Sequence, residues 1–333
     1  MTLIESTQTV PDALRGCVVA IGNFDGVHRG HQAVLSIARE QARALGAPVC
    51  ALTFEPHPRT FFRTDQPVFR LTPKEFKAQL LGVCGVEGVC VLEFNADLAG
   101  QEASEFVQRQ IIDRLGARHV VMGYDFHFGH GRKGSPRLMR EIGEKNGFSV
   151  TTVDQVTDDD GLAPFSSSSI REALRRGDVV EAARQLGYWW CVQGVVEKGD
   201  QRGRTIGFPT VNIHMNCDGH PANGIYACRV RDCASGEVWR GAGYVGDRPT
   251  FDRKGIVLEV HLLNFSGDLY DRELAVEFMD FVRIDRKYEH VTDLVDQMKT
   301  DCAEIDKILA RYEKNDPMLE HTLGRAVAKG SYA

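Results

Sequence analysis

Two histidines three positions apart, His28 and His31, lie in the segment AIGNFDGVHRGH of residues 20–31. The segment follows the apolar run CVVAI, and its glycines permit a close backbone approach or a positive φ. A helix that begins here points its first amides back toward the strand end, and histidines at i and i+3 share one of its faces. These groups together could bind an anion such as phosphate. The alternative is a tight turn that carries two solvated histidines.

A serine-rich segment, FSSSSIREALRRGD of residues 165–178, could also bind phosphate. Ser169 followed by Glu172 fits a capping box, so we expect a helix to begin there. The hydroxyl groups of the two preceding serines would then lie near its electropositive end. Arg171, in the first turn, could hold a triphosphate through its planar guanidinium. The alternative is a flexible polar linker with an ordinary surface arginine.

A second candidate site lies in GDQRGRTIGFPTVN, residues 199–212. Gly203 and Gly207 free backbone amides for phosphate contacts, while the hydroxyl of Thr210 and the side-chain carbonyl of Asn212 are hard oxygen ligands suited to Mg²⁺. As an isolated pattern, the segment is equally compatible with an ordinary turn.

A carboxylate alternates with apolar residues in VLEVHLLNF, residues 257–265. Glu259 and His261 share one face of the strand that this alternation predicts. Glu259 is therefore either an outward-facing solvated residue or a carboxylate held in place for chemistry.

Alternating strands and helices must position the first candidate site. Continuous apolar strands joined through helices predict a parallel sheet covered on both faces, whose ligands bind at the carboxyl ends of the strands. The histidine motif follows one such strand. The predicted strands are 17–22, 48–54, 88–94, 119–126 and 148–153, and the predicted helices are 30–45, 72–82, 102–116 and 136–146.

After Gly187 the pattern changes to short strands separated by turns, which predicts an antiparallel barrel or sandwich. The predicted strands are 190–199, 223–232, 257–265 and 273–282. A helix over about 290–312 should follow them. We expect a first domain over 1–186, a second over 187–314, and a loosely ordered tail over 315–333.

Composition limits the partners and the compartment. Forty Lys and Arg against 46 Asp and Glu give a net charge of −6, which lacks the basic excess expected of a protein that binds nucleic-acid phosphates. The start MTLIESTQTV has no basic region, and no apolar stretch approaches the roughly 20 residues of a spanning helix. Nine cysteines without a CxxC pair predict reduced core thiols, with a structural zinc site as the alternative. We expect a cytoplasmic protein that binds neither nucleic acid nor membrane.

The motifs together resemble one enzyme family. GNFDGVHRGHQ is similar to the HxGH signature of nucleotidyltransferases, and it resembles the first module of bifunctional bacterial riboflavin kinase/FMN adenylyltransferases. The likeness continues through TFEPHPRTFF, GYDFHFGHGRKG and FSSSSIREALRRGD, and GRTIGFPTVN is similar to the riboflavin kinase motif. The resemblance implies a Rossmann-like nucleotidyltransferase domain with a parallel sheet, then an antiparallel β-barrel riboflavin kinase domain with a C-terminal helix.

The resemblance also implies two reactions. In the first module, the phosphate of FMN attacks the α-phosphorus of ATP, giving FAD and pyrophosphate, and His28 and His31 are the catalytic residues. The implied ATP-binding residues of this module are Gly22, Phe24, Asp25, Gly30, Ser167, Ser168 and Arg171. In the second module, Glu259 is the implied base that takes a proton from riboflavin as it attacks the γ-phosphorus of ATP. The implied nucleotide-binding residues of this module are Gly203, Arg204, Gly207, Thr210 and Asn212, the last two also binding Mg²⁺.

The resemblance places a pocket for FMN beside the first site. Asp125 could bind a metal or hydrogen-bond the flavin side, and Phe126 and Phe128 are core or wall residues. His57 lines the same cleft or is an incidental loop histidine. We expect His57, Asp125 and Phe128 in this pocket.

Two departures from the family pattern affect the second module. YVG stands at residues 244–246 where the family has an Asn-Ile-Gly-like triplet, and Asp271 stands where it has glycine. These departures leave open one alternative, a protein that is mainly an FMN adenylyltransferase because its kinase half is impaired. A separate alternative is a flavin- or nucleotide-binding regulator without turnover. The sequence leaves the oligomeric state open.

Overall fold

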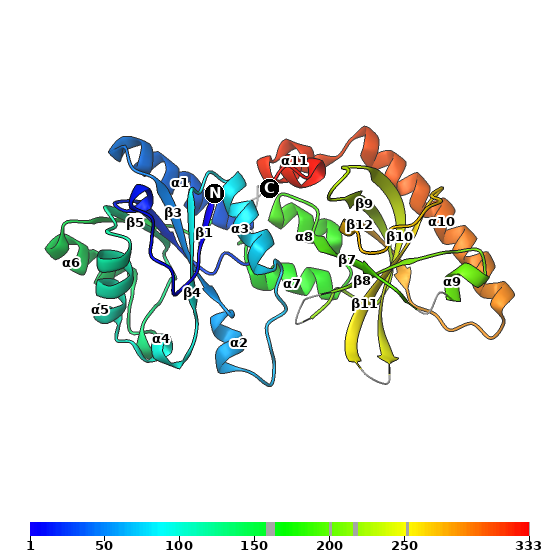
Figure 1. Cartoon of the computed structure of the whole chain (residues 1–333), viewed down its shortest axis with the longest axis horizontal. Coiled ribbons are helices and arrows are strands. Elements are labelled where there is room, and N and C mark those ends of the chain that lie inside the picture. Colours follow the sequence, from blue (N-terminus) through cyan, green and yellow to red (C-terminus); the bar gives the residue numbers. More distant parts are fainter. Residues whose placement is uncertain (158–163, 200–201, 216–218, 251–252, 333) are drawn as a thin grey trace. The chain divides into compact units, whose positions relative to one another are not determined.

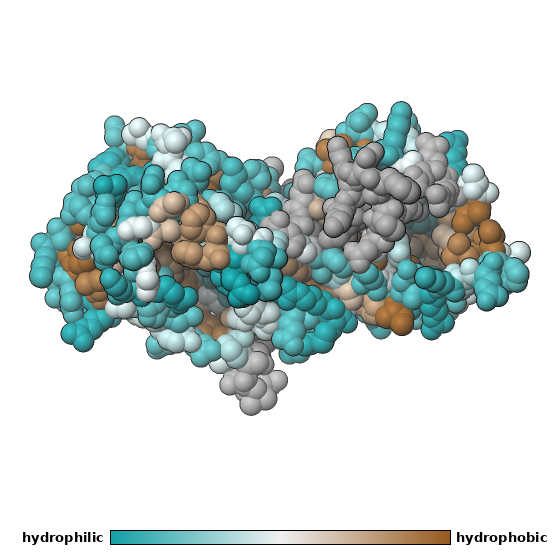
Figure 2. Space-filling model, turned by 90° about the horizontal axis from the view of Figure 1, so that it is seen from below, coloured by the Kyte–Doolittle hydropathy of each residue, from teal (hydrophilic) through white to brown (hydrophobic). Residues whose placement is uncertain are grey.

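The computed structural model describes residues 1–157, 164–199, 202–215, 219–250 and 253–332. Residues 1–167 together with Tyr332 form one compact unit, and residues 168–331 form a second. Within these described ranges, none of the helices has the length and apolar character needed to cross a membrane. On the face drawn in Figure 2, hydrophilic residues predominate and hydrophobic ones are scattered.

A six-stranded parallel sheet forms the centre of the first unit, in the order β1-β4-β3-β2-β5-β6 (Figure 1). The strands are β1 (Thr2–Ile4), β2 (Val18–Ile21), β3 (Val49–Glu55), β4 (Gly88–Glu93), β5 (His119–Gly123) and β6 (Ser149–Val153). The predicted parallel sheet and its five strands are confirmed. The edge strand β1 is additional, because three residues are too few to show a period.

Helices follow the strands of this sheet. They are α1 (Arg29–Leu45), α2 (Pro58–Phe62), α3 (Lys74–Val83), α4 (Ala96–Gly100), α5 (Ala103–Phe106), a π-helix (Val107–Arg114) and α6 (Pro136–Asn146). Alternate strand residues such as Leu52 and Val120 pack with Phe106, Ile111 and Met139 in one core. Helix α1 packs against β2, β3 and β5. All residues of β2 are buried, as expected of a central parallel strand.

A closed antiparallel barrel forms the centre of the second unit, in the order β10-β11-β8-β7-β12-β9. The strands are β7 (Cys191–Glu197), β8 (Val211–His214), β9 (Gly224–Asp232), β10 (Val238–Thr250), β11 (Arg253–Leu262) and β12 (Glu273–Ile284). The sequence predicted an antiparallel barrel or sandwich, and the structure shows the barrel. The sequence analysis did not predict β8 and β10.

Several helices accompany the barrel. They are α7 (Ser167–Arg175), α8 (Val179–Leu186), α9 (Arg202–Thr205), α10 (Val291–Lys314) and α11 (Thr322–Lys329). The long helix α10 packs against β9, β10 and β12 (Figure 1), as the apolar spacing predicted. Helices α7 and α8 group with the barrel, so the predicted boundary at residue 186 falls inside the second unit.

The expectation of a loosely ordered tail is wrong. Residues Pro317–Glu320 form a 3-10 helix, and Leu323 and Val327 of α11 are buried. The carboxylate of Asp316 accepts hydrogen bonds from the indole of Trp189 and the guanidinium of Arg229, each at 2.9 Å. These contacts join pairs of residues that are 127 and 87 positions apart in the sequence, so no local sequence pattern predicts them.

We expect Asp316→Ala to lower the free energy of unfolding of the second unit by about 3 kcal/mol, because it removes one partner from a buried charge network. Arg229 also pairs with the buried Glu277 at 2.6 Å. The measurement is urea unfolding followed by tryptophan fluorescence. Asp306→Ala is the matched control, because the Asp306 side chain is 49% exposed in its pair with Arg240 and its loss should cost less than about 1 kcal/mol. Equal effects of the two variants would contradict the prediction.

Candidate functional site

The histidine motif forms the turn between β2 and α1. Phe24, Gly26 and Val27 have φ values of 50°, 82° and 39°, so the chain turns sharply and delivers His28 as the N-cap residue of α1. The rings of His28 and His31 stack, with centroids 3.6 Å apart and planes 24° apart. His28 is 6% exposed. The turn therefore presents a paired imidazole surface at the carboxyl end of β2, where ligands of parallel sheets bind.

Two glycines of the motif leave room for the rings of His28 and Phe24. A Cβ at Gly30 would lie 3.1 Å from the ring of His28, and a Cβ at Gly22 would lie 3.3 Å from the ring of Phe24. Phe24 in turn meets the ring of His31 edge-on at 5.3 Å. The groups that approach these two glycines closely are thus the aromatic rings of the motif itself.

The side chain of Asp25 binds backbone amides of the segment that precedes α3. Its carboxylate, 4% exposed, accepts hydrogen bonds from the amides of Leu71 at 2.9 Å and Thr72 at 3.1 Å. Ser167 donates from its hydroxyl to the carbonyl oxygen of Asp25 at 2.9 Å. These contacts give Asp25 a part in shaping the turn, while its predicted contact with ATP stays a prediction.

The predicted capping box is wrong. Helix α7 begins at Ser167, two residues before the expected cap, so Ser169 lies inside the helix and donates to the side-chain carbonyl of Gln185 at 2.5 Å. Arg171 is consequently beyond the first turn and is 5% exposed. Ser168 is exposed. Ser168 and Arg171 belong to the second unit and Ser167 to the first.

The three residues expected in an FMN pocket have different surroundings. The ring of His57 caps α2 by accepting a hydrogen bond from the amide of Arg59 at 3.1 Å. Asp125 is exposed. Phe128 is 5% exposed and packs against Phe106 with ring centroids 5.5 Å apart, so it is a core residue rather than an open wall.

A buried ion pair near the motif escaped the sequence analysis. Lys77 of α3 contacts Glu55 at the end of β3 at 2.6 Å, and the Lys77 side chain is only 4% exposed. The signal was present in the sequence: Lys77 follows Phe76 and precedes Leu80 on the apolar face of the predicted helix, where a lysine needs a partner.

Three hard oxygen donors come together on the barrel. Asn212 of β8 and Glu259 of β11 are register partners, and Thr210 donates from its hydroxyl to the Glu259 carboxylate at 3.3 Å. Leu258 and Val260, on either side of Glu259, are fully buried, whereas Glu259 is half-buried on the opposite face. A hydroxyl, an amide carbonyl and a carboxylate fit the ligand preference of Mg²⁺.

The glycine-rich segment before this cluster forms a tight turn. A Cβ at Gly203 would lie 2.2 Å from the carbonyl oxygen of Phe208, so only glycine fits there. Gly207 has a φ of 88°, and its amide donates to the carbonyl of Arg204 at 3.3 Å. His261 bonds from its ring nitrogen Nδ1 to the carbonyl of Pro209 at 2.8 Å, which ties this turn to β11. The turn thereby fixes the residues that lead to Thr210.

The two departures from the family pattern fit the barrel. Tyr244 is the β10 register partner of Glu259 and donates from its hydroxyl to Asp285 at 3.0 Å. A Cβ at Gly246 would lie 2.2 Å from that hydroxyl, so the glycine makes room for the tyrosine. Asp271 has a φ of 62° in the turn before β12 and donates its amide to the carbonyl of Val196 at 3.1 Å.

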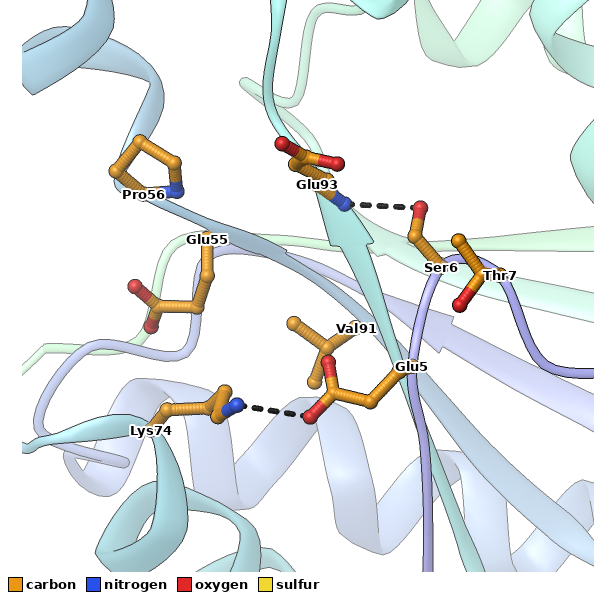
Figure 3. Close-up of a pocket in the computed structure, with 8 residues that line it drawn as sticks. All are labelled: Glu5, Ser6, Thr7, Glu55, Pro56, Lys74, Val91 and Glu93. Atoms are coloured by element: carbon orange, nitrogen blue, oxygen red, sulfur yellow. Dashed lines mark hydrogen bonds and ion pairs between the residues drawn. The ribbon is translucent and has the colours of Figure 1, made fainter.

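A pocket of about 360 Å³ in the first unit contains none of the predicted site residues. Figure 3 shows it at the ends of β3 and β4, with the Lys74 ammonium bonded to the Glu5 carboxylate at 2.8 Å. Glu55 also lines it, and so links its wall to the buried Lys77. Three carboxylates and one ammonium make this wall predominantly acidic, in contrast to the imidazole surface of the motif.

Comparisons with known proteins match both units. Residues 10–168 match the family model of FAD synthetase, and residues 186–309 match that of riboflavin kinase. The chain is 40% identical over 304 residues to a bifunctional riboflavin kinase/FMN adenylyltransferase of Pseudomonas fluorescens, covering 91% of this chain and 96% of that protein. It is 35% identical over 302 residues to the protein of the same name from Escherichia coli strain K12, covering 90% and 96%.

A solved structure matches as well. It is titled as a macrolide-efflux protein from Streptococcus pneumoniae, is 29% identical, and superposes with a TM-score of 0.79 over 90% of this chain and 97% of that one. This chain thus covers 96% of the length of each of the two curated relatives. The chain belongs to the family of bifunctional riboflavin kinases/FMN adenylyltransferases.

Proposed function

We propose that this chain phosphorylates riboflavin to FMN in its barrel unit and joins AMP to FMN in its first unit, forming FAD. One observation carries the proposal: each segment that matches a family model contains its own polar constellation, the stacked His28 and His31 in one and the Thr210–Glu259 pair in the other. ATP is a substrate of both reactions.

In the kinase reaction, Glu259 takes the proton from the ribityl hydroxyl of riboflavin as that oxygen attacks the γ-phosphorus of ATP. The bond from this phosphorus to the bridging oxygen breaks, and ADP leaves. Thr210 and Asn212 would hold Mg²⁺, which when bound would supply neutralisation of the phosphate charge during phosphoryl transfer. The hydrogen bond from Thr210 keeps the Glu259 carboxylate oriented before substrate binds. Gly203, Arg204 and Gly207 approach the nucleotide from the preceding turn.

In the adenylyl transfer, a phosphate oxygen of FMN attacks the α-phosphorus of ATP, and pyrophosphate leaves. No protein nucleophile is needed, so the chain contributes alignment and charge stabilisation. His28 and His31 bind the phosphates through their ring nitrogens, and the motif turn supplies Gly22, Phe24 and Gly30 beside them. Arg171, Ser167 and Ser168 stay predicted nucleotide ligands.

The direct test gives the purified full chain riboflavin, ATP and Mg²⁺ and resolves flavins by chromatography over time. FMN should appear first and FAD should follow, with pyrophosphate released in step with FAD. FAD formed from supplied FMN but not from riboflavin would favour the impaired kinase, an alternative that gains no support from the bifunctional names of the relatives. Thermal stabilisation by FMN or ATP without any product would favour a non-catalytic regulator.

We place these reactions in the cytoplasm. The support is that the eight cysteines within the described ranges are free, because disulfides are rare in the reducing cytoplasm and common in secreted proteins. Small-molecule flavins and ATP are the partners we propose.

A further inference from the structure

The segment that enters α3 is bonded to the motif turn from outside it. The Asp25 carboxylate accepts from the amides of Leu71 and Thr72, and the hydroxyl of Thr72 accepts in return from the amide of Gly26 at 3.0 Å. The Thr72 hydroxyl also donates to the Asp25 carboxylate at 3.4 Å. Thr72 is 1% exposed and Asp25 4%, so water does not compete for these bonds. We call this reciprocal set of contacts the Asp25–Thr72 clasp.

The clasp spans the strained part of the turn. Phe24 and Val27 are not glycines, yet their φ values of 50° and 39° lie in the left-handed region. Each such residue costs on the order of 1–3 kcal/mol and persists only where its surroundings over-determine it. Asp25 and Gly26, the two residues between them, are those that the clasp holds. The next residue after Val27 is His28.

A second brace reaches the start of the same turn. The carbonyl oxygen of Asn23 accepts from the hydroxyl of Thr53 at 3.0 Å and from the ammonium of Lys77 at 3.5 Å. Lys77 is itself fixed by Glu55. Lys77 inside α3 therefore contacts the start of the turn, and Thr72, two residues before the helix, contacts its middle.

We infer that Thr72 is a positioning residue for adenylyl transfer: through Asp25 and Gly26 it fixes the turn that sets the His28 ring against His31. The inference rests on the proposed function of these histidines. The hydrogen bonds of Thr72 go to Asp25 and Gly26, so it acts on the rings through the backbone of the turn. A misplacement of about 1 Å in a catalytic group costs on the order of a hundredfold in rate.

The test compares Thr72→Val, which keeps the shape and removes the hydroxyl, with Thr72→Ser, which keeps the hydroxyl. For Thr72→Val, we expect kcat for FAD formation to fall about tenfold or more while KM for FMN and for ATP changes less than about twofold. Thr72→Ser should restore most of kcat. Riboflavin phosphorylation by the same samples reports the kinase unit and should stay at the wild-type rate.

A readout independent of turnover separates this inference from the proposed function. In protein labelled with ¹⁵N-histidine, Thr72→Val should shift the imidazole resonances of His28 and His31, assigned with single-alanine variants, and leave that of His261 in place. The control is Thr60→Val, which removes a hydroxyl of α2 that accepts from the amide of Val68, in the segment before α3, at 3.1 Å. It should shift neither motif histidine.

Unmoved resonances in Thr72→Val, or a kcat as low in Thr72→Ser as in Thr72→Val, would overturn the positioning role. A rise in KM with unchanged kcat would overturn it as well, because it would indicate lost substrate binding. If the wild-type chain forms no FAD but the resonances shift as expected, the proposed adenylyl transfer fails and the clasp stands as the determinant of ring position.

Discussion

FAD formation from FMN and ATP is expected to fall by about 10²–10³-fold when either His28 or His31 is replaced by alanine, while the same protein still phosphorylates riboflavin at the wild-type rate. A single preorganised donor aimed at developing charge contributes about this much to a rate. Because the two rings stack with centroids 3.6 Å apart, the proposed function has both act on one ligand, and the two losses should be similar.

The measurement is initial-rate FAD formation at saturating FMN and ATP, with FMN formation from riboflavin measured on the same preparation. His130→Ala is the matched control, because the side chain of His130 is 60% exposed in the same unit. It should leave both rates unchanged. Equal loss of both activities in His28→Ala would argue against separate sites, and full FAD formation in both motif variants would exclude the histidines from the reaction.

Glu259→Gln is expected to slow riboflavin phosphorylation by about 10²–10⁴-fold, the usual contribution of a general base. Glutamine keeps the size and an acceptor oxygen for the Thr210 hydroxyl, so the barrel should keep its fold, but the amide takes no proton at neutral pH. FAD formation from supplied FMN should not change, because that reaction belongs to the other unit.

The measurement is FMN formation from riboflavin at saturating MgATP. Glu237→Gln, on the exposed turn between β9 and β10, is the control of equal charge change and should be silent. A mixture of Glu259→Gln with His28→Ala gives a further check, since each variant retains the activity that the other lacks and the mixture should make FAD from riboflavin. An active Glu259→Gln enzyme would remove Glu259 from the role of base.

Strands and helices with a regular hydrophobic periodicity were predictable from the sequence, whereas the glycine-rich strand β10 was not. Strand β10 was missed because Gly241 and Gly243 resemble turn residues in sequence. In the barrel, a Cβ at Gly241 would lie 2.6 Å from a methyl of Val260, and one at Gly243 would lie 2.7 Å from the sulfur of Cys228. These glycines serve close packing between neighbouring strands, which depends on partners far away in the sequence.

The candidate sites also combine local sequence patterns, which were predictable, with contacts between distant residues, which were not. The histidine turn and the alternation around Glu259 are local patterns, so the sequence sufficed to find them. The partners of Asp25 are 46 and 47 positions away, and the partner of Ser169 is 16 positions away on the next helix. Local reasoning therefore assigned Ser169 to a helix cap, whereas its hydroxyl bonds to the next helix. It also missed the backbone contacts of Asp25, whose nucleotide role, implied by the resemblance, stays a prediction.

The contacts of the C-terminal segment have a consequence for the order in which the chain folds during synthesis. Trp189, just before the first barrel strand, bonds to Asp316, and Arg231 of β9 donates to the carbonyl of Ala328. The ribosome must therefore deliver nearly the entire second unit before its buried charges are paired. The first unit, apart from Tyr332, consists of residues synthesised earlier, so its parallel sheet can form while the barrel is still emerging.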